Sequence, residues 1–258
     1  MDGALNLALL QAELAWEDPE ANRNAFTNII REIPGETDLI VLPEMFTSGF
    51  TMNPSALANS EGPVTLEWMR AHASATGAAI CGSIVFASEA RYYNRLLFVY
   101  PDGHYMSYDK RHTFTLAGEN KVYEAGNKRC ILEFKGFRIC PMICYDLRFP
   151  VWSRNTESYD LLIYVANWPA PRILAWDTLL RARAIENMAF CAGVNRIGTD
   201  DNGHAYTGHS AVYDSLGETV VFSEERGVLK ACLQKAHLDK TRKSLRFLDD
   251  RDEFSLVM

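Results

Sequence analysis

Apolar residues along this chain gather in short runs, and polar, turn-forming segments separate the runs. Each early run is too short for a helix and is bounded by turn residues, so it predicts a buried strand. The runs in the first third of the chain are residues 5–12, 38–42 and 78–87. Helices are predicted between them, because Asp18-Pro19 joins an N-cap to a helix-starting proline, and a second helix opens at Pro63 and ends at Gly77.

The rest of the chain predicts hairpins, one more long helix and several further strands. Pro101-Asp102-Gly103 is a strong turn signal, so residues 92–100 and 104–109 should form a hairpin. Apolar positions at helical spacing predict a helix over residues 171–188. The remaining predicted elements are a hairpin of 129–134 with 137–144, strands at 160–166, 189–195, 209–214, 218–222 and 228–233, and a closing helix and tail over 237–251.

Helices and strands alternate in the first half of the chain, and strands come in hairpins in the middle. This order predicts an α/β domain with mixed sheets rather than a purely parallel sheet. A length of 258 residues suits one large domain or two small ones. Because no repeat, low-complexity stretch or linker divides the chain, we expect a single domain over residues 1–258.

Composition and charge exclude several classes of function. The net charge is −7 without any basic run, which argues against binding to nucleic acid. No apolar run is long enough to span a bilayer, and no signal-peptide pattern is present, so we expect a cytoplasmic protein whose six cysteines are reduced thiols. The sequence has neither Cys-x-x-Cys nor His-Glu-x-x-His, so no metal and no other cofactor is expected.

Residues 137–150 hold the first candidate for chemistry. The apolar run from Phe137 to Ile143 predicts a buried strand that stops abruptly at Cys144, where the chain turns. A thiol held at the rigid end of a core strand can still meet solvent, which suits a nucleophile. The other interpretation is a small buried hydrophobe, because a free thiol needs a base and an oxyanion site before it does chemistry.

Glu44 and Lys110 share this context, since each follows a strand-like run and begins a polar loop. If the three strands are neighbours in one sheet, these side chains converge with Cys144 at its edge. A nearby ammonium lowers the pKa of a thiol, and a carboxylate can take the thiol proton and return it to a leaving amine. Taken singly, the glutamate also fits a surface salt bridge and the lysine a surface charge.

Together the three groups predict acyl transfer from an amide or nitrile through a thioester. The lysine ammonium and the backbone N–H of Tyr145, which follows the thiol, would hold the developing oxyanion. A loop of about 18 residues follows Lys110, and loops of this length in a compact domain are usually functional.

Three blocks of the sequence resemble the catalytic blocks of the nitrilase, or carbon–nitrogen hydrolase, superfamily, and they occur in that family's order. The blocks are Leu39-Ile40-Val41-Leu42-Pro43-Glu44-Met45-Phe46, Tyr108-Asp109-Lys110-Arg111-His112-Thr113-Phe114 and Ile143-Cys144-Tyr145-Asp146-Leu147-Arg148-Phe149-Pro150. Weaker matches near Gly126, along residues 181–187 and over 208–212 extend the resemblance across residues 5–235.

The resemblance implies a four-layer α-β-β-α sandwich and pairing of subunits into a homodimer or a higher homo-oligomer. It assigns Glu44 as general base, Lys110 as stabiliser of the tetrahedral intermediate and Cys144 as nucleophile. The family often has a second glutamate in the loop after the lysine, which would hold that lysine. Glu119 is the better match in this chain, and Glu124 is the alternative.

Three longer segments narrow the resemblance to bacterial omega-amidases, which hydrolyse 2-oxoglutaramate to 2-oxoglutarate and ammonia; related members also take 2-oxosuccinamate. These segments are residues 43–50, 146–155 and 165–170. The resemblance implies a small-molecule amide substrate and a role in clearing the products of glutamine transamination, including in methionine salvage.

Such a substrate has a carboxylate far from its amide, and the negative net charge calls for a local cation to hold it. Arg148 and Arg172 are the candidates, because a half-buried arginine can bind a carboxylate with two hydrogen bonds. Aromatic side chains should form apolar walls, although each also fits core packing. The predicted walls are Phe46, Phe114 and Trp168, and His112 is expected to be a hydrogen-bonded scaffold residue.

Other functions remain open at this point. The same chemistry could act on a nitrile, an N-carbamoyl amine or deaminated glutathione. A protease-like site could pair Cys144 with His204 or His209. The chain could also be a binding module in which Cys144 belongs to the core. Neither of the last two explains three polar residues of complementary roles at strand ends.

Overall fold

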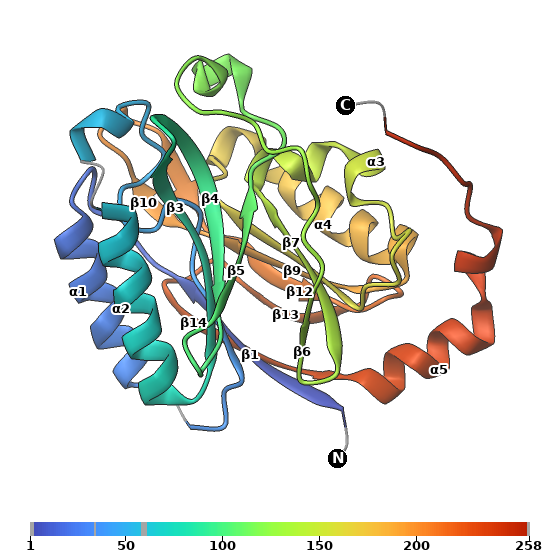
Figure 1. The fold of residues 1–258 in the computed structure, drawn as a ribbon. Helices are drawn as coiled ribbons and strands as arrows, with labels where there is room; N and C mark the ends of the chain where they lie inside the picture. The colour runs from blue at the N-terminus through green and yellow to red at the C-terminus, as the bar shows by residue number, and fades with distance from the viewer. Residues whose placement is uncertain (1–2, 34, 58–60, 257–258) are drawn as a thin grey trace.

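The computed structural model of the protein describes residues 3–33, 35–57 and 61–256. Two six-stranded mixed sheets form its framework (Figure 1). In spatial order the first sheet consists of β14 (Gly227–Gln234), β1 (Ala4–Gln11), β2 (Leu39–Val41), β3 (Ala79–Ser88), β4 (Arg91–Val99) and β5 (Tyr105–Asp109). The second consists of β13 (Thr219–Ser223), β12 (Ser210–Tyr213), β9 (Phe190–Asn195), β8 (Leu161–Ala166), β7 (Phe137–Ile143) and β6 (Leu132–Phe134).

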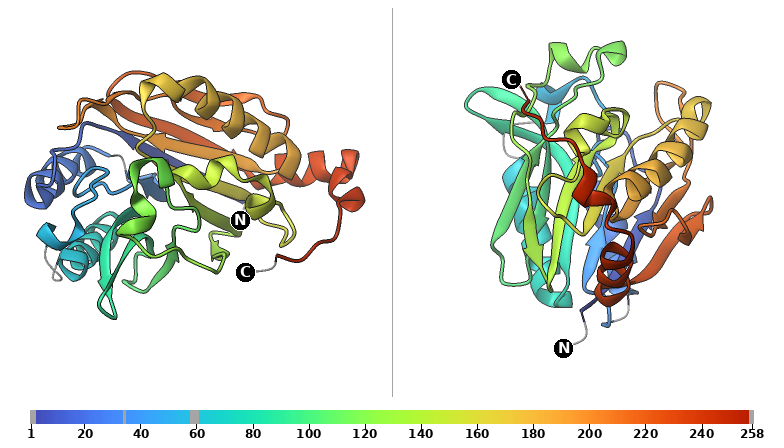
Figure 2. Two further views of the ribbon diagram at one scale, coloured as in Figure 1. Left: turned by 90° about the horizontal axis from the view of Figure 1, so that it is seen from above. Right: turned by 90° about the vertical axis from the view of Figure 1, so that its right-hand side faces the viewer.

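Helices cover the outer faces of the two sheets. Figure 2 shows α1 and α2 on one outside face and α4 on the opposite one, with the sheets packed between them. This is the four-layer α-β-β-α sandwich that the resemblance implied. The helices are α1 (Pro19–Arg31), α2 (Glu61–Thr76), α3 (Pro150–Ser153), α4 (Ile173–Asn187) and α5 (Lys235–Leu245).

Side chains alternate between the two faces of each strand, so one sheet contributes to an apolar layer on each of its faces. In β1, Leu5, Leu7 and Leu9 point into the core between the sheets. Ala8 and Leu10 point to the other side, where α1 and α2 pack. Successive side chains of a strand face opposite ways, so a strand buried on both faces has a continuous apolar sequence.

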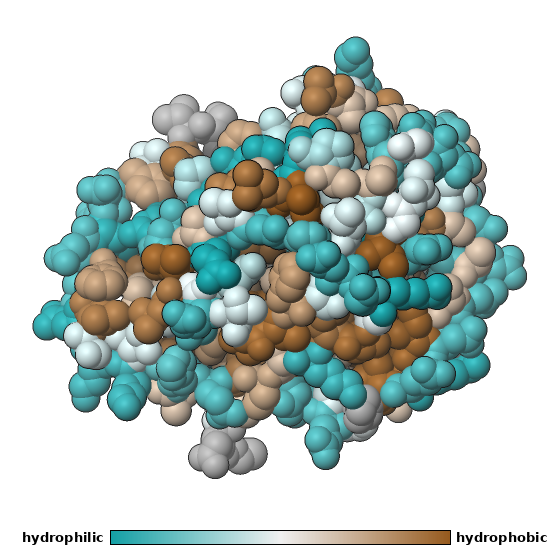
Figure 3. Space-filling view, turned by 180° about the vertical axis from the view of Figure 1, so that it is seen from behind, coloured by the Kyte–Doolittle hydropathy of each residue, from teal (hydrophilic) through white to brown (hydrophobic). Residues whose placement is uncertain are grey.

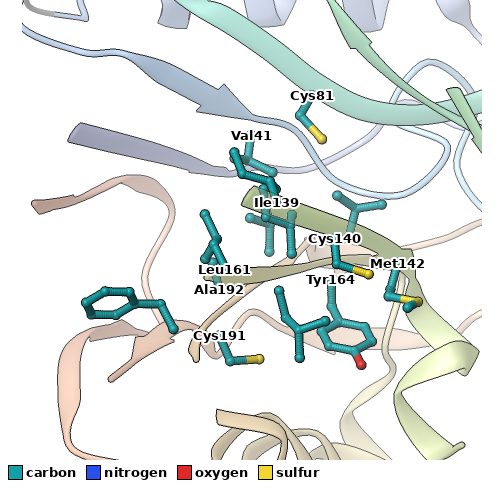
Figure 4. Packing of buried hydrophobic residues seen from close by; sticks show 14 of the residues in the cluster. Val41, Cys81, Ile139, Cys140, Met142, Leu161, Tyr164, Cys191 and Ala192 are labelled. Carbon is teal, nitrogen blue, oxygen red and sulfur yellow. The ribbon is translucent and has the colours of Figure 1, made fainter. Parts of the chain in front are cut away.

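The core between the sheets takes side chains from both of them. Figure 4 shows Val41 and Cys81 of the first sheet beside Ile139, Leu161 and Ala192 of the second. All five are completely buried. Burial of one such aliphatic side chain contributes about 1.5–3 kcal/mol, so this core fixes how the two sheets, and the loops at their ends, lie relative to one another.

Several element boundaries differ from the predicted ones. The helix expected to open at Pro63 begins at Glu61, because the first turn of a helix tolerates proline. The helix expected over 171–188 begins as a 3-10 turn, η5 (Ala170–Arg172), before α4. A short ribbon of β10 (Ile197–Thr199) and β11 (Ala205–Thr207) was not predicted.

The loops also contain further 3-10 turns. These are η1 (Pro54–Leu57), η2 (Thr115–Ala117), η3 (Glu119–Lys121), η4 (Cys144–Arg148) and η6 (Phe247–Asp250). Among the described residues, no helix is both long enough and apolar enough to cross a membrane.

Candidate active site

The candidate catalytic residues do follow strand ends, but their strands are not neighbours in one sheet. Glu44 follows β2 and Lys110 follows β5 in the first sheet, whereas Cys144 follows β7 in the second. The condition of three neighbouring strands in one sheet, under which convergence was expected, is therefore not met. Face-to-face packing of the two sheets brings the strand ends together instead.

Lys110 lies between two glutamates and donates hydrogen bonds to both. Its Nζ lies 2.8 Å from Glu44 Oε1, and 3.0 and 2.9 Å from the two carboxylate oxygens of Glu119. Glu119 also accepts the backbone N–H of Phe114 at 2.5 Å. All three charged side chains are buried, with at most 1% of their surface exposed. The buried ammonium is thus compensated by two carboxylates, as buried charges require.

The structure separates the two candidates for the second glutamate. Glu119 opens η3 and reaches Lys110. Glu124 is exposed and pairs with Arg91, whose Nη1 lies 3.5 Å away. Only Glu119 therefore belongs to the charged cluster.

The charges in this cluster keep the lysine protonated. Burial by itself lowers the pKa of Lys110, but the nearby carboxylates of Glu119 and Glu44 outweigh burial and raise the pKa above its usual value. Burial raises the pKa of Glu119, and the positive charge of Lys110 opposes that rise. Lys110 therefore remains an ammonium throughout the neutral pH range.

Cys144 occupies a strained turn beside the glutamate. Its φ of 42° is in the left-handed region, which is uncommon for a residue other than glycine. Its sulfur lies 4.0 Å from the backbone oxygen of Asn167. The N–H of Asn167 donates to Glu44 Oε2 at 2.8 Å, and its side-chain amide donates to the backbone oxygen of Glu44 at 2.6 Å. Asn167 thus holds the carboxylate next to the thiol.

The thiol is protonated in the free protein at neutral pH. Burial raises the pKa of Cys144 well above its ordinary value, the Glu44 carboxylate raises it further, and Lys110 opposes both effects. From the sequence we expected the lysine to lower the pKa of this thiol. The lysine does act in that direction, but it is outweighed, so attack by this sulfur requires a base that removes its proton.

A buried aspartate braces the turn of the nucleophile. Asp146 Oδ2 accepts the N–H of Ile143 at 3.0 Å and the hydroxyl of Tyr108 at 2.7 Å. Its Oδ1 accepts the backbone N–H of His112 at 3.0 Å and lies 2.8 Å from His112 Nδ1. The His112 ring stacks on Phe149 with centroids 3.7 Å apart. His112 is therefore a scaffold residue, as predicted, and it ties the segment after Lys110 to the turn at Cys144.

A pocket opens above the sulfur and encloses about 520 Å³, including space open to solvent. Its lining includes the predicted Tyr145, Arg148, Phe114, Trp168 and Arg172. The guanidinium of Arg148 lies over the Trp168 ring at 4.9 Å, and that of Arg172 lies over Phe114 at 5.3 Å. The pocket thus joins aromatic walls to two guanidinium groups.

The prediction of Phe46 as a pocket wall is wrong. Phe46 is fully buried in the layer between α1, α2 and the first sheet, where it packs against Phe26 and Trp68. The backbone of Met45 has a φ of 43°, and this turn directs the next side chain back into the core. Phe50 lines the pocket instead, with Lys110 Nζ 5.0 Å from its ring centroid.

A thiol, a carboxylate and an ammonium therefore surround one pocket, and a second carboxylate holds the ammonium. This arrangement suits nucleophilic attack on a carbonyl carbon with proton transfer to and from the leaving group. Comparison with known proteins agrees with this chemistry, because the profile of the Carbon-nitrogen hydrolase family matches residues 6–243.

The chain belongs to the carbon–nitrogen hydrolase family.

Relatives of this hydrolase match it over nearly their whole lengths. Omega-amidase YafV of Yersinia enterocolitica is 48% identical over 98% of this chain and 99% of its own. The 2-oxoglutaramate amidase of Bacillus subtilis strain 168 is 30% identical over 95% of this chain and 96% of its own. A similar solved structure is that of XC1258 from Xanthomonas campestris, a CN-hydrolase superfamily protein with an arsenic adduct in its active site. The two structures superpose with a TM-score of 0.95 and are 43% identical in sequence, over 98% of this chain and 99% of XC1258. The protein is therefore an amide-hydrolysing enzyme of the nitrilase superfamily.

Sequence reasoning missed several residues of the hydrolase's site. Asn94 bonds to both glutamates, and Phe50, His204 and Tyr206 line the pocket. Asn167 lies within residues 165–170, directly after a predicted strand, so the position that singled out Glu44 also singles out Asn167. Asn94 shares its strand face with buried Leu96 and Phe98, so a polar residue at a core-facing position was the available signal.

The histidines of the protease-like alternative have other surroundings. His209 Nδ1 lies 3.0 Å from Asp177 on α4. His204 lines the pocket, but the charges that act on the pKa of Cys144 are those of Glu44, Lys110 and Glu119. Glu44, rather than either histidine, is therefore a charged group that acts on the thiol.

Proposed function

We propose that this hydrolase is an omega-amidase that converts 2-oxoglutaramate, and also 2-oxosuccinamate, to the 2-oxo diacid and ammonia. The observation that carries the proposal is the buried Glu44–Lys110–Glu119 cluster beside the Cys144 thiol. The identity to omega-amidase YafV and to a 2-oxoglutaramate amidase supports this substrate class over nitriles, N-carbamoyl amines and deaminated glutathione.

In the proposed first half-reaction, Glu44 takes the thiol proton as the sulfur attacks the amide carbon. The carbonyl oxygen becomes an oxyanion, which the Lys110 ammonium and the N–H of Tyr145 stabilise; each such donor typically contributes about 3–4 kcal/mol. Glu44 then gives the proton to the amide nitrogen, the C–N bond breaks and ammonia leaves. A thioester on Cys144 remains.

In the second half-reaction Glu44 removes a proton from a water molecule that attacks the thioester carbon. The C–S bond breaks, the proton returns to the sulfur and the diacid is released. Glu119 keeps Lys110 in place through both halves, because it accepts hydrogen bonds from the ammonium on both carboxylate oxygens. The cluster thus needs no cofactor for either step.

We propose that Arg148 binds the far carboxylate of the substrate. The residue is half-buried, lines the pocket and stacks on Trp168, which leaves the edge of its guanidinium free to donate two hydrogen bonds. Neither Arg148 nor Arg172 pairs with a carboxylate in the part of the chain that the structure describes. Phe114 and Trp168 would then pack on the carbon chain of a small acid.

Ammonia release from 2-oxoglutaramate tests the proposed function. The wild type should release ammonia, and Cys144→Ala should lose activity by at least about 10⁴-fold, because loss of a nucleophile removes the thioester route. Cys232→Ala is the matched control, since Cys232 is exposed, and it should keep full activity. Undiminished activity in Cys144→Ala would refute the mechanism, and faster turnover of a nitrile or an N-carbamoyl amine would refute the substrate.

We also propose the domain organisation, the cellular location and the metabolic role of the protein. The two sheets share one apolar core, which supports a single domain over residues 1–258; residues 1, 2, 257 and 258 of that range lie outside the described part. All six cysteines are free thiols, which fits the reducing cytoplasm. In this setting the enzyme would clear the products of glutamine transamination, including those formed in methionine salvage.

We propose a homodimer or a higher homo-oligomer that forms through the face carrying α4. Figure 3 views the molecule from this side and shows apolar residues among polar ones. Leu174 and Ile185 on α4 are 77% and 47% exposed. Exposed apolar groups on a helix that covers a sheet fit contact with a second subunit.

A further inference from the structure

Asn94 contacts three parts of the site from a single position on β4. Its side-chain Nδ2 lies 2.8 Å from Glu44 Oε1 and 3.2 Å from Glu119 Oε1. Its backbone oxygen accepts the N–H of Lys110 at 3.0 Å. The residue is completely buried. One asparagine therefore touches the proposed base, the lysine and the glutamate that holds the lysine.

Lys110 and Asn94 donate to the same two oxygen atoms. Glu44 Oε1 and Glu119 Oε1 each receive one bond from the ammonium and one from the amide. The four atoms form a closed ring in which donors and acceptors alternate. Such a ring fixes both carboxylates, because moving either one breaks bonds to two donors.

The orientation of the Asn94 amide follows from this ring. With its Nδ2 facing the carboxylates, its Oδ1 is buried and has no hydrogen-bond partner among the described residues. The reverse orientation would place a carbonyl oxygen against two carboxylates, which costs more than one unsatisfied acceptor. An unpaired buried oxygen is rare in a folded protein and costs stability.

We infer that Asn94 is a positioning residue that keeps the Glu44 carboxylate aimed at the Cys144 thiol while holding Glu119 on Lys110. The inference rests on the proposed function, since it assigns the same glutamate as base. Asn94 acts through the glutamates and does not touch the reacting atoms. An uncharged donor suits this place because a second ammonium would pair with both carboxylates and weaken the base, whereas an amide stabilises the ionised forms without adding charge.

Asn94→Leu tests the inference, because leucine keeps the approximate size but removes the donor. We expect kcat to fall by about 10- to 100-fold, the contribution of hydrogen bonds to charged groups, with KM changed less than about 3-fold because the substrate is not contacted. Loss of the donor removes a hydrogen bond that stabilises the ionised carboxylates, so the acid limb of the kcat/KM profile should move to higher pH.

Asn94→Asp provides an independent variant of the same size. At neutral pH it adds a third carboxylate to the cluster and should lower kcat at least as much as Asn94→Leu. When the new carboxyl group is protonated it can donate one hydrogen bond, so activity relative to wild type should rise as the pH falls. The two variants thus respond to pH in opposite directions, which general damage to the fold would not produce.

Asn155→Leu is the matched control. Asn155 is a completely buried asparagine that bonds to Tyr159 and Asn187, away from the pocket. It should lower stability but leave the pH profile in place. An unmoved profile in both Asn94 variants, or an equal shift in Asn155→Leu, would overturn the inference.

Iodoacetamide labelling separates this inference from the proposed substrate. The rise of Cys144 labelling with pH should begin at higher pH in Asn94→Leu than in wild type, while exposed Cys232 labels equally in both. A wild type that is inactive on 2-oxoglutaramate but shows this shift would refute the substrate and keep the role of Asn94. Identical Cys144 labelling curves would refute that role.

Discussion

Under the proposed function, Arg148 is the side chain that sets the substrate preference of this pocket. The protein has a net charge of −7, which repels an anionic substrate, so binding depends on cations at the site. The ammonium of Lys110 already forms ion pairs with Glu44 and Glu119. The guanidinium of Arg148 is instead fixed over Trp168 at the pocket wall. Preorganisation of this kind lowers the entropic cost of binding a carboxylate.

We predict that Arg148→Met raises KM for 2-oxoglutaramate by about 10- to 100-fold, as expected for loss of a bidentate, charge-assisted contact. Turnover of a neutral amide of the same length should change little, because that amide has no carboxylate to lose. Steady-state kinetics on the two amides measure the difference. Arg172→Met is the paired control, and a selective KM effect there alone would move the assignment to Arg172.

Among single residues, the sequence located the proposed reacting groups better than their surroundings. Glu44, Lys110 and Cys144 were found because each ends an apolar run. Phe46 was misplaced because the backbone turn at Met45 follows from tertiary packing and has no signature in the sequence. Asn94 was missed although it shares its strand face with Leu96 and Phe98, because Leu97 and Val99 make the other face apolar as well and alternation does not tell which face meets the core.

Among the elements, the loop after β5 determines the position of the lysine. This segment folds back on itself, because the N–H of Gly126 donates to the backbone oxygen of Lys110 at 2.8 Å. Gly126 also packs closely, since a Cβ at this position would lie 2.1 Å from the backbone oxygen of Asp109. Asp109 is itself held by a bidentate pair with Arg95, at 2.6 and 2.9 Å. The backbone before Lys110 therefore has little freedom to move away.

Gly126→Ala should accordingly lower kcat by about 10- to 100-fold, since small displacements of catalytic groups are costly. It should also destabilise the fold by about 1–3 kcal/mol, the usual cost of overpacking. Enzyme kinetics and denaturant unfolding measure the two effects. Gly35→Ala is the control, because a Cβ there meets nothing within 4 Å, and both quantities should stay near wild type. Wild-type turnover in Gly126→Ala would show that the loop can relax without moving the lysine.

The sequence predicted this loop only as a long connection with a functional role. Its two short 3-10 turns, η2 and η3, lie below the length at which hydrophobic periodicity is informative. Some predicted helix boundaries also differ from the observed ones for local reasons. For example, α2 begins before Pro63 because the first turn of a helix tolerates proline.

At the scale of the whole molecule, packing of the two sheets brings the Cys144 thiol to the Glu44 and Lys110 side chains, which a single sheet would not do. Alternation of apolar and polar runs predicted the strands, but it does not reveal that they divide into two sheets. The three-block resemblance supplied the sandwich, and the sandwich explains why a thiol after β7 meets a carboxylate after β2. Layer assignment depends on contacts between residues far apart in the chain, which local patterns do not encode.

For the whole molecule we predict that the double variant Leu174→Glu/Ile185→Glu converts the proposed oligomer to a monomer, because two buried charges without partners would oppose association. Light scattering after size-exclusion chromatography measures the mass. Val64→Glu, on the outer helix α2 and with 48% exposure, should leave the oligomer intact. A wild type that is already a monomer, or a double variant that stays associated, would contradict an interface on this face.

The left-handed backbone of Cys144 has an evolutionary consequence. Glycine would occupy that conformation without the steric cost of about 1–2 kcal/mol that other residues bear, yet glycine cannot attack a carbonyl. Selection for stability and selection for turnover therefore act in opposite directions on position 144. A descendant that kept the fold for another purpose would be free to become more robust by abandoning its sulfur.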